Sequence, residues 1–143
     1  MEPTYPRTSI TAELARHLIE AAQTHARSLG LAITTAVVDE SGILKAFSRM
    51  DRSPLIASGA SHKKAKTAVG FGIPTGQAWH EFIKDDPILE HGAQQLDDFI
   101  LLGGGLPIVY DGQLIGAIGV SGGHYAQDEA CARAALECLE PVA

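Results

Sequence analysis

The apolar residues near the start of the chain repeat at the spacing of one helical face. Residues 12–29 place their apolar side chains on a single stripe, as in a helix that packs one side against a core. Thr11 is the expected N-cap, because its hydroxyl can accept a hydrogen bond from a free amide, and Gly30 is the expected stop. We therefore predict a first helix. The stripe contains Leu14, Leu18, Ala21, Ala22 and Leu29.

The pattern then changes from helical spacing to the alternation of strands. Residues 32–38 form a β-branched run, residues 39–42 have turn chemistry, and residues 43–50 alternate between apolar and polar positions. This pattern predicts a β-hairpin. The Ser-Pro pair at 53–54 has the composition of an N-cap followed by proline in the first turn, so we predict a second helix from there to about Gly70.

The second half of the chain contains weak helical signals and one clear hairpin. Glycine and proline leave room for short helices at residues 77–83 and 88–95. Residues 99–120 contain apolar runs on both sides of Asp111-Gly112, a pair that favours a type I′ turn because both positions adopt positive φ. We predict two or three antiparallel strands here and a last helix over residues 128–139. This order predicts an α+β fold, with helices packed against one antiparallel sheet.

Length and charge narrow the class of protein. The 143 residues suit a single domain over 1–143, and 45% hydrophobic with 20% charged residues is typical of a globular chain. The net charge of −6 repels nucleic acids and anionic membrane surfaces, so neither is an expected partner. No apolar run approaches the roughly 18 residues of a membrane span, and the N-terminus lacks secretory features. We therefore expect a cytoplasmic protein.

The two cysteines fit the same compartment. Cys131 and Cys138 lie seven positions apart in one predicted helix, which places their Cα atoms about 10 Å apart. This exceeds the reach of a disulfide. Free thiols suit a reducing compartment, and packing is their expected role.

Charge is unevenly distributed along the chain. Residues 42–66 contain six basic residues and one acidic residue, whereas residues 81–98 contain six acidic residues and one basic residue. The basic zone is compatible with a small anionic ligand. The alternative is that the two faces complement each other within one subunit or between subunits.

Two glycine-rich segments, residues 103–105 and 116–123, lack the spacing of dinucleotide-binding and P-loop motifs. The second precedes a helix whose first turn carries Asp128 and Glu129, and these carboxylates would repel a phosphate. We therefore interpret the glycines as positions of unusual backbone geometry, or of close approach by a ligand or a neighbouring subunit.

Few side chains are candidates for chemistry. The six histidines include no pair at i,i+4 and no His-Glu-x-x-His, so no metal site is predicted. His124 stands out because it lies in a glycine-rich loop between a strand and a helix, where functional side chains concentrate. Lys64 has small neighbours; it can pair with a carboxylate, become nucleophilic if desolvated, or simply be solvated.

Six motifs stand in a fixed order along nearly the whole chain. They are residues 37–44 (VVDESGIL), 49–54 (RMDRSP), 64–68 (KAKTA), 103–108 (GGGLPI), 115–122 (IGAIGVSG) and 127–129 (QDE). In this order they resemble the GlcG/HbpS-like family of haem-degrading domain proteins. The resemblance implies a profilin-like α+β fold and homo-oligomers from dimers to octamers. It also implies a tetrapyrrole or small organic ligand, because members bind haem, are fused to a PduO-type corrinoid adenosyltransferase, or lie among small-molecule catabolic enzymes.

The first functional hypothesis is a protein that binds haem or a related anionic tetrapyrrole, with haem as the candidate cofactor and no other cofactor expected. Arg49, Arg52 or Lys64 would face the propionates, and His124 would be an axial ligand of the iron. The remaining candidate ligand-binding residues are Gly103, Gly104, Gly105, Gly122 and Gly123.

The alternative is a cofactor-independent catabolic enzyme, an isomerase, tautomerase or lyase, that acts on a small carboxylate or carbonyl substrate. Lys64 or Arg49 would hold the carboxylate, and His124 would move a proton next to the carbonyl. Tyr125 or glycine amides would stabilise the enolate. A third alternative is an assembly or regulatory module without a ligand.

The second predicted helix also indicates self-association, because small residues on a helix let another backbone approach closely. We therefore predict a homo-oligomer. The contributing residues are Leu55, Ile56, Gly59, Ala60 and Ala68.

Overall fold

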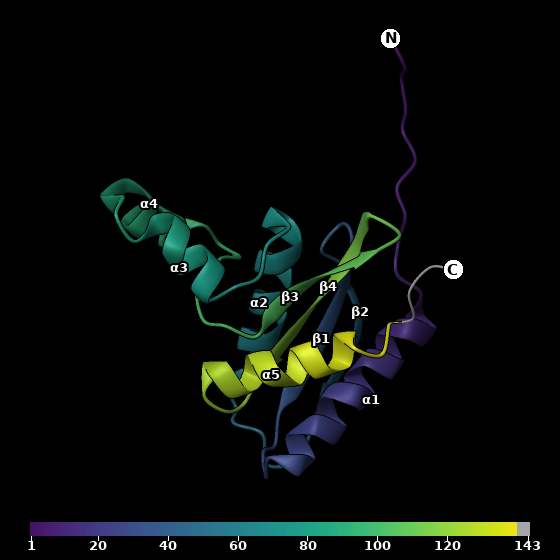
Figure 1. Cartoon of the computed structure of the whole chain (residues 1–143), viewed down its shortest axis with the longest axis vertical. Coiled ribbons are helices and arrows are strands. Elements are labelled where there is room, and N and C mark those ends of the chain that lie inside the picture. Colours follow the sequence, from purple (N-terminus) through teal and green to yellow (C-terminus); the bar gives the residue numbers. More distant parts are fainter. Residues whose placement is uncertain (140–143) are drawn as a thin grey trace.

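The computed structural model describes residues 1–139, and Figure 1 shows the order of their helices and strands. The elements are α1 (Ala12–Ser28), β1 (Thr34–Asp39), β2 (Leu44–Arg49), α2 (Ala57–Phe71), α3 (Gln77–Ile83), α4 (Pro87–Gly92), the 3₁₀-helix η1 (Ala93–Gln95), β3 (Gly105–Tyr110), β4 (Gln113–Ser121) and α5 (Tyr125–Leu136). The first residues of the chain extend away from the body, and residues 1–9 are all exposed. Within residues 1–139, no helix combines the length and apolar character needed to cross a membrane.

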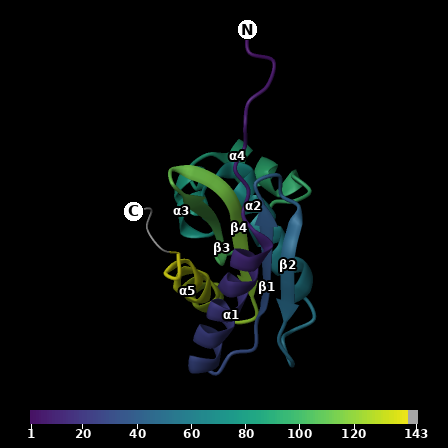
Figure 2. The same ribbon diagram turned by 90° about the vertical axis from the view of Figure 1, so that its right-hand side faces the viewer.

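The four strands form one antiparallel sheet in the order β2-β1-β4-β3. Helix α2 lies on one side of this sheet, and α1 and α5 lie together on the other (Figure 2). The predicted α+β class, with helices packed on an antiparallel sheet, is confirmed. The predicted turn at Asp111-Gly112 is also confirmed, since both residues have positive φ and join β3 to β4.

Two apolar clusters hold the helices to the sheet. The larger lies under α1 and α5, and it includes Leu18, Val37 and Ile118, each fully buried. The smaller lies under α2 and consists mostly of small side chains, which lets this helix approach the sheet closely. Its members are Val38, Ala65, Ala68, Val69 and Ala117.

Glycines in the strands make the close approach of α2 possible. A Cβ atom added at Gly119 of β4 would overlap the carbonyl oxygen of Ser61, and one at Gly105 of β3 would overlap that of Lys64. Both obstacles are backbone atoms of α2, so a side chain at either position would push the helix off the sheet. These glycines are sites of close approach, but the approaching group is a helix of the same chain and not the ligand or neighbouring subunit that we expected.

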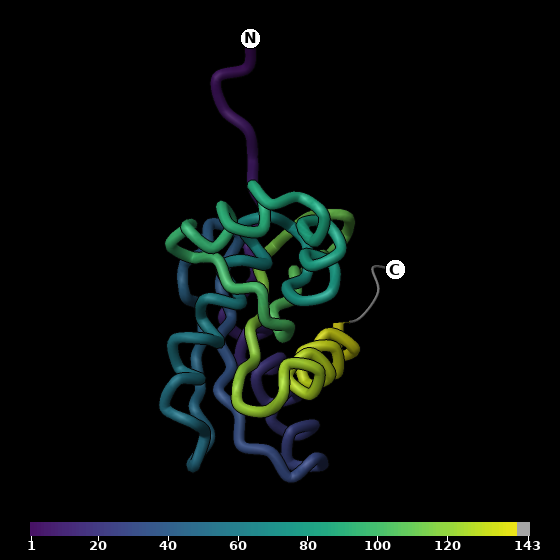
Figure 3. Tube along the Cα trace, turned by 90° about the vertical axis from the view of Figure 1, so that its left-hand side faces the viewer, coloured from purple at the N-terminus to yellow at the C-terminus, as the bar shows by residue number. Residues whose placement is uncertain are grey.

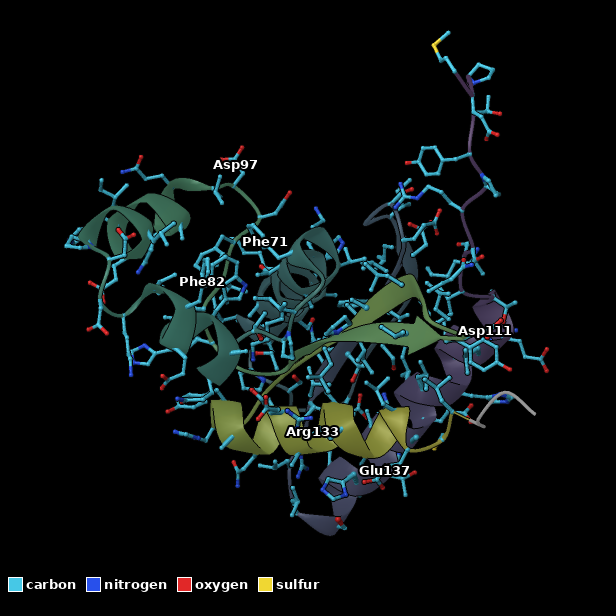
Figure 4. All side chains as sticks on the ribbon, turned by 45° about the horizontal axis from the view of Figure 1, so that its top comes forward. Phe71, Phe82, Asp97, Asp111, Arg133 and Glu137 are labelled. Carbon is cyan, nitrogen blue, oxygen red and sulfur yellow. The ribbon has the colours of Figure 1, made fainter. Side chains whose placement is uncertain are left out.

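Residues 73–98, which we call the lobe, contain α3, α4 and η1 and lie at one end of the molecule beside α2 (Figures 1 and 3). Its attachment is a small aromatic cluster. Trp79 packs edge-on against Phe71 of α2, with ring centroids 4.6 Å apart, and against Phe99 at 5.3 Å. Figure 4 shows Phe71 and Phe82 where the lobe meets α2.

Several predicted elements match the structure closely. Helix α1 begins after Thr11, whose side chain accepts a hydrogen bond from the amide of Leu14, and it ends just before Gly30 at φ 70°. The first hairpin and α3 are also where the pattern predicts them. The stripe of α1 is shifted, however, since Leu29 is exposed. The residues that α1 buries are Ala15, Leu18, Ile19, Ala22 and Ala26.

Two helix starts differ from the prediction. Helix α2 begins at Ala57 because the Ser53 hydroxyl is not a cap: it shares a buried 2.8 Å hydrogen bond with the hydroxyl of Thr34. Helix α5 begins at Tyr125, three residues early, because His124 is its N-cap. It also ends at Leu136 rather than at 139.

The apolar run at residues 99–102 is not a strand, so this region contains two strands rather than three. The run instead lies along α2, where the Thr67 hydroxyl donates to the Asp98 carbonyl at 2.6 Å and accepts from the Ile100 amide at 3.0 Å. These side-chain bonds satisfy backbone groups that a ladder would otherwise pair. The segment therefore connects the lobe to the sheet along the edge of α2.

Candidate functional site

A buried ion pair joins the two faces of the sheet. Lys64 of α2 donates from Nζ to Asp128 Oδ2 of α5 at 3.0 Å and to the Val120 carbonyl at 2.8 Å. Lys64 is 1% exposed and Asp128 is 2% exposed. Burial lowers the pKa of the Lys64 ammonium, and the charge and hydrogen bond of Asp128 oppose that shift. The interpretation of Lys64 as a solvated lysine is therefore wrong, and its pairing with a carboxylate is confirmed.

Asp128 also positions the glycine loop that precedes α5. Its Oδ1 atom accepts a 2.8 Å hydrogen bond from the amide of Gly123, while its Oδ2 atom binds Lys64. The sequence analysis did not indicate this role, because it interpreted Asp128 only as a first-turn carboxylate that would repel a phosphate. The carboxylate fixes the loop relative to α2 through both of its oxygens.

The start of β3 is held by a residue for which the sequence contains no signal. Thr75, fully buried, accepts from the Gly105 amide through Oγ1 and donates from its own amide to the Gly105 carbonyl, both at 2.9 Å. These two bonds close the connection between the lobe and the sheet. They also fix the backbone beside Gly104, whose missing side chain leaves room for Lys64: a Cβ there would lie 3.1 Å from Nζ.

A cavity of about 630 Å³ lies over the ion pair. It is bounded by the N-terminal half of α2, residues 100–102 and residues 121–125, and we call it the α2–α5 cavity. Ile56, Ile100 and Leu102 supply apolar walls, and Lys63 supplies an exposed ammonium group. Since Lys64 and Asp128 neutralise each other, Lys63 leaves the cavity with a positive balance.

The structure brings four of the predicted site residues together. Lys64, Gly123, His124 and Tyr125 all line the α2–α5 cavity. His124 is exposed, Tyr125 is half-exposed, and their rings lie against each other with centroids 4.1 Å apart and planes tilted by 35°. These two aromatic rings form the rim beside α5.

The other predicted glycines have structural surroundings. Gly104 and Gly105 are buried against Lys64, and Gly122, with φ 150°, lies against the Ala32 carbonyl. Gly103 lines a neighbouring cavity together with Tyr125. Of the predicted glycines, only Gly123 lines the α2–α5 cavity.

Arg49 and Arg52 lie apart from the other candidates. Arg49 is exposed at the end of β2, an edge strand of the sheet, and Arg52 is exposed in the following turn with φ 70°. Neither side chain lines the α2–α5 cavity. The cation beside the cavity is instead Lys63, which the sequence analysis did not select.

His124 has a structural function that constrains its chemistry. Its Nδ1 atom accepts from the Ala126 amide and its own amide donates to Gln127 Oε1, both at 3.1 Å. With Nδ1 as an acceptor, the neutral ring carries its proton on Nε2. An imidazole that binds a metal through Nε2 carries its proton on Nδ1, so metal binding would break this cap.

A separate cavity of about 660 Å³ lies between residues 96–99, the turn at 40–42 and the C-terminal half of α2. Its charged side chains are Arg7, Lys66, Glu40, Asp97 and Asp98. Carboxylates outnumber cations there, so an anionic ligand is better accommodated by the α2–α5 cavity. Within residues 1–139, no three His, Cys, Asp or Glu side chains gather as a metal site would require.

Several of the groups that the enzyme hypothesis needs are already engaged. The Lys64 ammonium binds Asp128 and Val120, and the Gly123 amide binds Asp128, so neither is free for a substrate carboxylate or an enolate. His124 uses one ring nitrogen as a helix cap. Nothing in the described part of the chain supports the enzyme alternative.

Comparisons with known proteins identify the family of this chain. The model of the family described as haem degrading protein HbpS-like matches residues 10–137. Protein GlcG of Escherichia coli K12 is 37% identical over 112 residues, which cover 78% of this chain and 81% of GlcG.

Solved structures of HbpS and PduOC are similar to this chain in fold and in sequence. A double mutant of Streptomyces reticuli HbpS is 28% identical with a TM-score of 0.83 and 98% coverage of both chains. A PduOC complex with haem is also 28% identical, with a TM-score of 0.78 and coverage of 92% of this chain and 96% of that one. The predicted resemblance is confirmed: the chain belongs to the HbpS-like family.

Proposed function

We propose that this chain binds haem or a related carboxylated tetrapyrrole in the α2–α5 cavity. The observation that carries the proposal is the combination of apolar walls with an exposed cation, Lys63, above a floor whose charges cancel. A volume of about 630 Å³ is within the usual range of small-molecule sites. The haem-bound structure of the similar PduOC supports the choice of ligand.

The lining residues fit such a ligand. Ile56, Ile100 and Leu102 would contact the apolar faces of the macrocycle, and Tyr125 would lie against it with its half-exposed ring. Lys63 would pair with a carboxylate, because its ammonium is exposed and Lys64 is held by Asp128. When bound, haem supplies an iron centre for electron transfer or for binding a small gas.

We also propose that the chain forms a homo-oligomer through the start of α2. Leu55 and Ile56 are 83% and 80% exposed, and the nearby Gly59 is exposed. Ala68, which we predicted to be part of this surface, is instead fully buried between α2 and the sheet. Sedimentation of a monomer at micromolar concentration would contradict this part of the proposal.

We also propose a cytoplasmic location, because the cysteines suit a reducing compartment. Cys131 and Cys138 are both free thiols, which is consistent with a reducing compartment.

Titration with haemin, followed by the Soret absorption, tests ligand binding directly. We expect saturable binding by the wild type and at least tenfold weaker binding by Ile56→Asp, because a carboxylate would face both an apolar ring and the ligand's own carboxylates. The matched control is Leu55→Asp. Leu55 is equally exposed and adjacent but does not line the cavity, so this variant should bind like the wild type even if both variants weaken self-association.

Haemin with esterified propionates separates the polar contact from the apolar one. We expect Lys63→Gln to weaken the binding of haemin and to leave the binding of the ester unchanged. A wild-type titration without a Soret change, or equal effects of Ile56→Asp and Leu55→Asp, would overturn the proposal.

A further inference from the structure

A second cavity continues the α2–α5 cavity toward the lobe. It has a volume of about 290 Å³ and lies between the start of α3 and residues 101–103. Leu102 and Tyr125 line both cavities, so they form a ridge between them. A flat ligand that rests on this ridge would contact both sides at once.

One imidazole faces this second cavity. His80 of α3 is exposed and lines it together with Gln77. In the described part of the chain, Gln77 binds Glu81 at 2.7 Å, and neither ring nitrogen of His80 is hydrogen-bonded. His80 can therefore present an unprotonated nitrogen to a metal without losing another bond, whereas His124 cannot.

The backbone of His80 is fixed close to the ridge. Its amide donates to the Gly76 carbonyl at 2.9 Å, which places it one turn after the start of α3. A Cβ at Gly76 would lie 2.9 Å from the Cα atom of Gly103, so the two chain segments touch there. Tyr125 lies against Gly103 in turn, since a Cβ at Gly103 would be 3.5 Å from Tyr125 Cδ2. This chain of contacts connects α3 to the rim of the α2–α5 cavity.

We propose that His80 is the residue that coordinates the iron of the tetrapyrrole, and that His124 remains the N-cap of α5. The inference rests on the function proposed above. It extends the site across Leu102 and Tyr125, and it assigns the two nearby histidines to different tasks. The donated electron pair comes from a neutral imidazole nitrogen, so the coordination step requires no further reactant.

Absorption spectra of the ferric and ferrous haemin complexes test the assignment. We expect His80→Ala to shift the Soret band and to bind haemin at least tenfold more weakly, because iron loses a nitrogen ligand. Added imidazole should restore the wild-type spectrum of His80→Ala, which a merely structural role would not explain. His91→Ala, in the exposed part of the same lobe, is the matched control and should keep the wild-type spectrum.

Thermal unfolding without haemin separates the cap from the ligand. We expect His124→Ala to lower Tm, because a helix cap is lost, and to keep the wild-type band positions once haemin is bound. His80→Ala should leave the Tm of the ligand-free protein unchanged.

The outcomes distinguish the two proposals. A wild type that does not bind haemin would overturn the proposed function. A wild type that binds, together with an unaltered spectrum of His80→Ala, would overturn only the assignment of His80. A band shift in His124→Ala that added imidazole reverses would show that His124, and not His80, coordinates the iron.

Discussion

The contact of α2 with the sheet and the attachment of the lobe differ in the size of the side chains that make them. Helix α2 packs on β1, β3 and β4 mostly through small side chains, with Lys64 and Val69 as its larger buried residues. The lobe is attached by large aromatic rings, and its α4 has no buried residue. Phe82 and Ile88 of the lobe are 63% and 83% exposed.

This difference indicates that the contact between α2 and the sheet is rigid and that the lobe can adjust its position more easily. Where backbone meets backbone, as at Gly119 and Ser61, no atom can be added without moving a helix. The aromatic contacts of the lobe leave more freedom, and residues of the lobe line the cavities of about 660 Å³ and about 290 Å³. Substitutions under α2 should therefore cost far more stability than equivalent ones at the lobe.

The largest effect is expected from breaking the ion pair under α2. Lys64→Met leaves the Asp128 carboxylate buried without its partner and should lower the free energy of unfolding by about 3–5 kcal/mol. Urea denaturation followed by circular dichroism measures the change.

The double variant Lys64→Met with Asp128→Asn tests whether the unpaired charge is the cause. The asparagine oxygen can still accept from the Gly123 amide, and no charge remains buried. We expect the double variant to be more stable than Lys64→Met alone. If the double variant lost as much stability as the single variants Lys64→Met and Asp128→Asn lose together, the explanation by an unpaired charge would be wrong.

The next effect tests the close backbone approach. Gly119→Ala places a Cβ against the Ser61 carbonyl and 2.7 Å from the Ala65 nitrogen, and it should cost about 1–3 kcal/mol. Gly59→Ala is the control on the exposed side of α2, where no atom lies within 4 Å of the new methyl group. It should stabilise the helix by about 0.5–1 kcal/mol. A neutral effect of both changes would show that α2 can move away from the sheet at little cost.

The features that the sequence could predict are those that depend on contacts between residues close in the chain. The Thr11 cap, the hairpin turn at Asp111-Gly112 and the boundaries of α3 depend on residues close in the chain, and these predictions are confirmed. Local chemistry determines such features because the groups that satisfy each other lie within one turn. The α+β class follows from the order of these elements.

The site was only partly predictable, since its central contacts join distant residues. Lys64 and Asp128 are 64 positions apart, and no local pattern indicates that they meet. The tertiary hydrogen bond of Ser53 to Thr34 likewise overrides a good local cap signal. His124 was selected for its exposed loop position, and its role as a cap depends on Gln127, which the sequence analysis did not consider. The glycine-rich segments did indicate close packing, but they did not indicate which helix approaches them.

A smaller effect concerns the other face of the sheet. Cys131 of α5 is fully buried, and burial, followed by the charge of Asp128, raises the pKa of its thiol to about 11 from 9.0. Above pH 9 the unfolded chain releases this proton while the folded chain retains it, so stability falls as pH rises toward 11. The loss should reach about 1 kcal/mol at pH 10.

Comparison with Cys131→Ala isolates this thiol, because all other groups titrate in both proteins. We expect the wild type to lose stability relative to Cys131→Ala between pH 8 and pH 10. Cys138→Ala, which removes the exposed thiol, should follow the wild type. A constant difference between wild type and Cys131→Ala over this range would contradict the raised pKa.

The smallest effect is expected from the ion pair that joins α2 to the lobe. Lys66 lies two residues after Lys64, but its Nζ is 3.5 Å from Asp98 and the two side chains are 33% and 62% exposed. Water screens this pair and solvates either partner alone, so Lys66→Gln should change the free energy of unfolding by at most about 0.5 kcal/mol. Added salt should remove even that difference, whereas the cost of Lys64→Met should persist because its partner is buried. A cost at Lys66 comparable to that at Lys64 would mean that the lobe is held as firmly as α2, and the distinction between the two regions would fail.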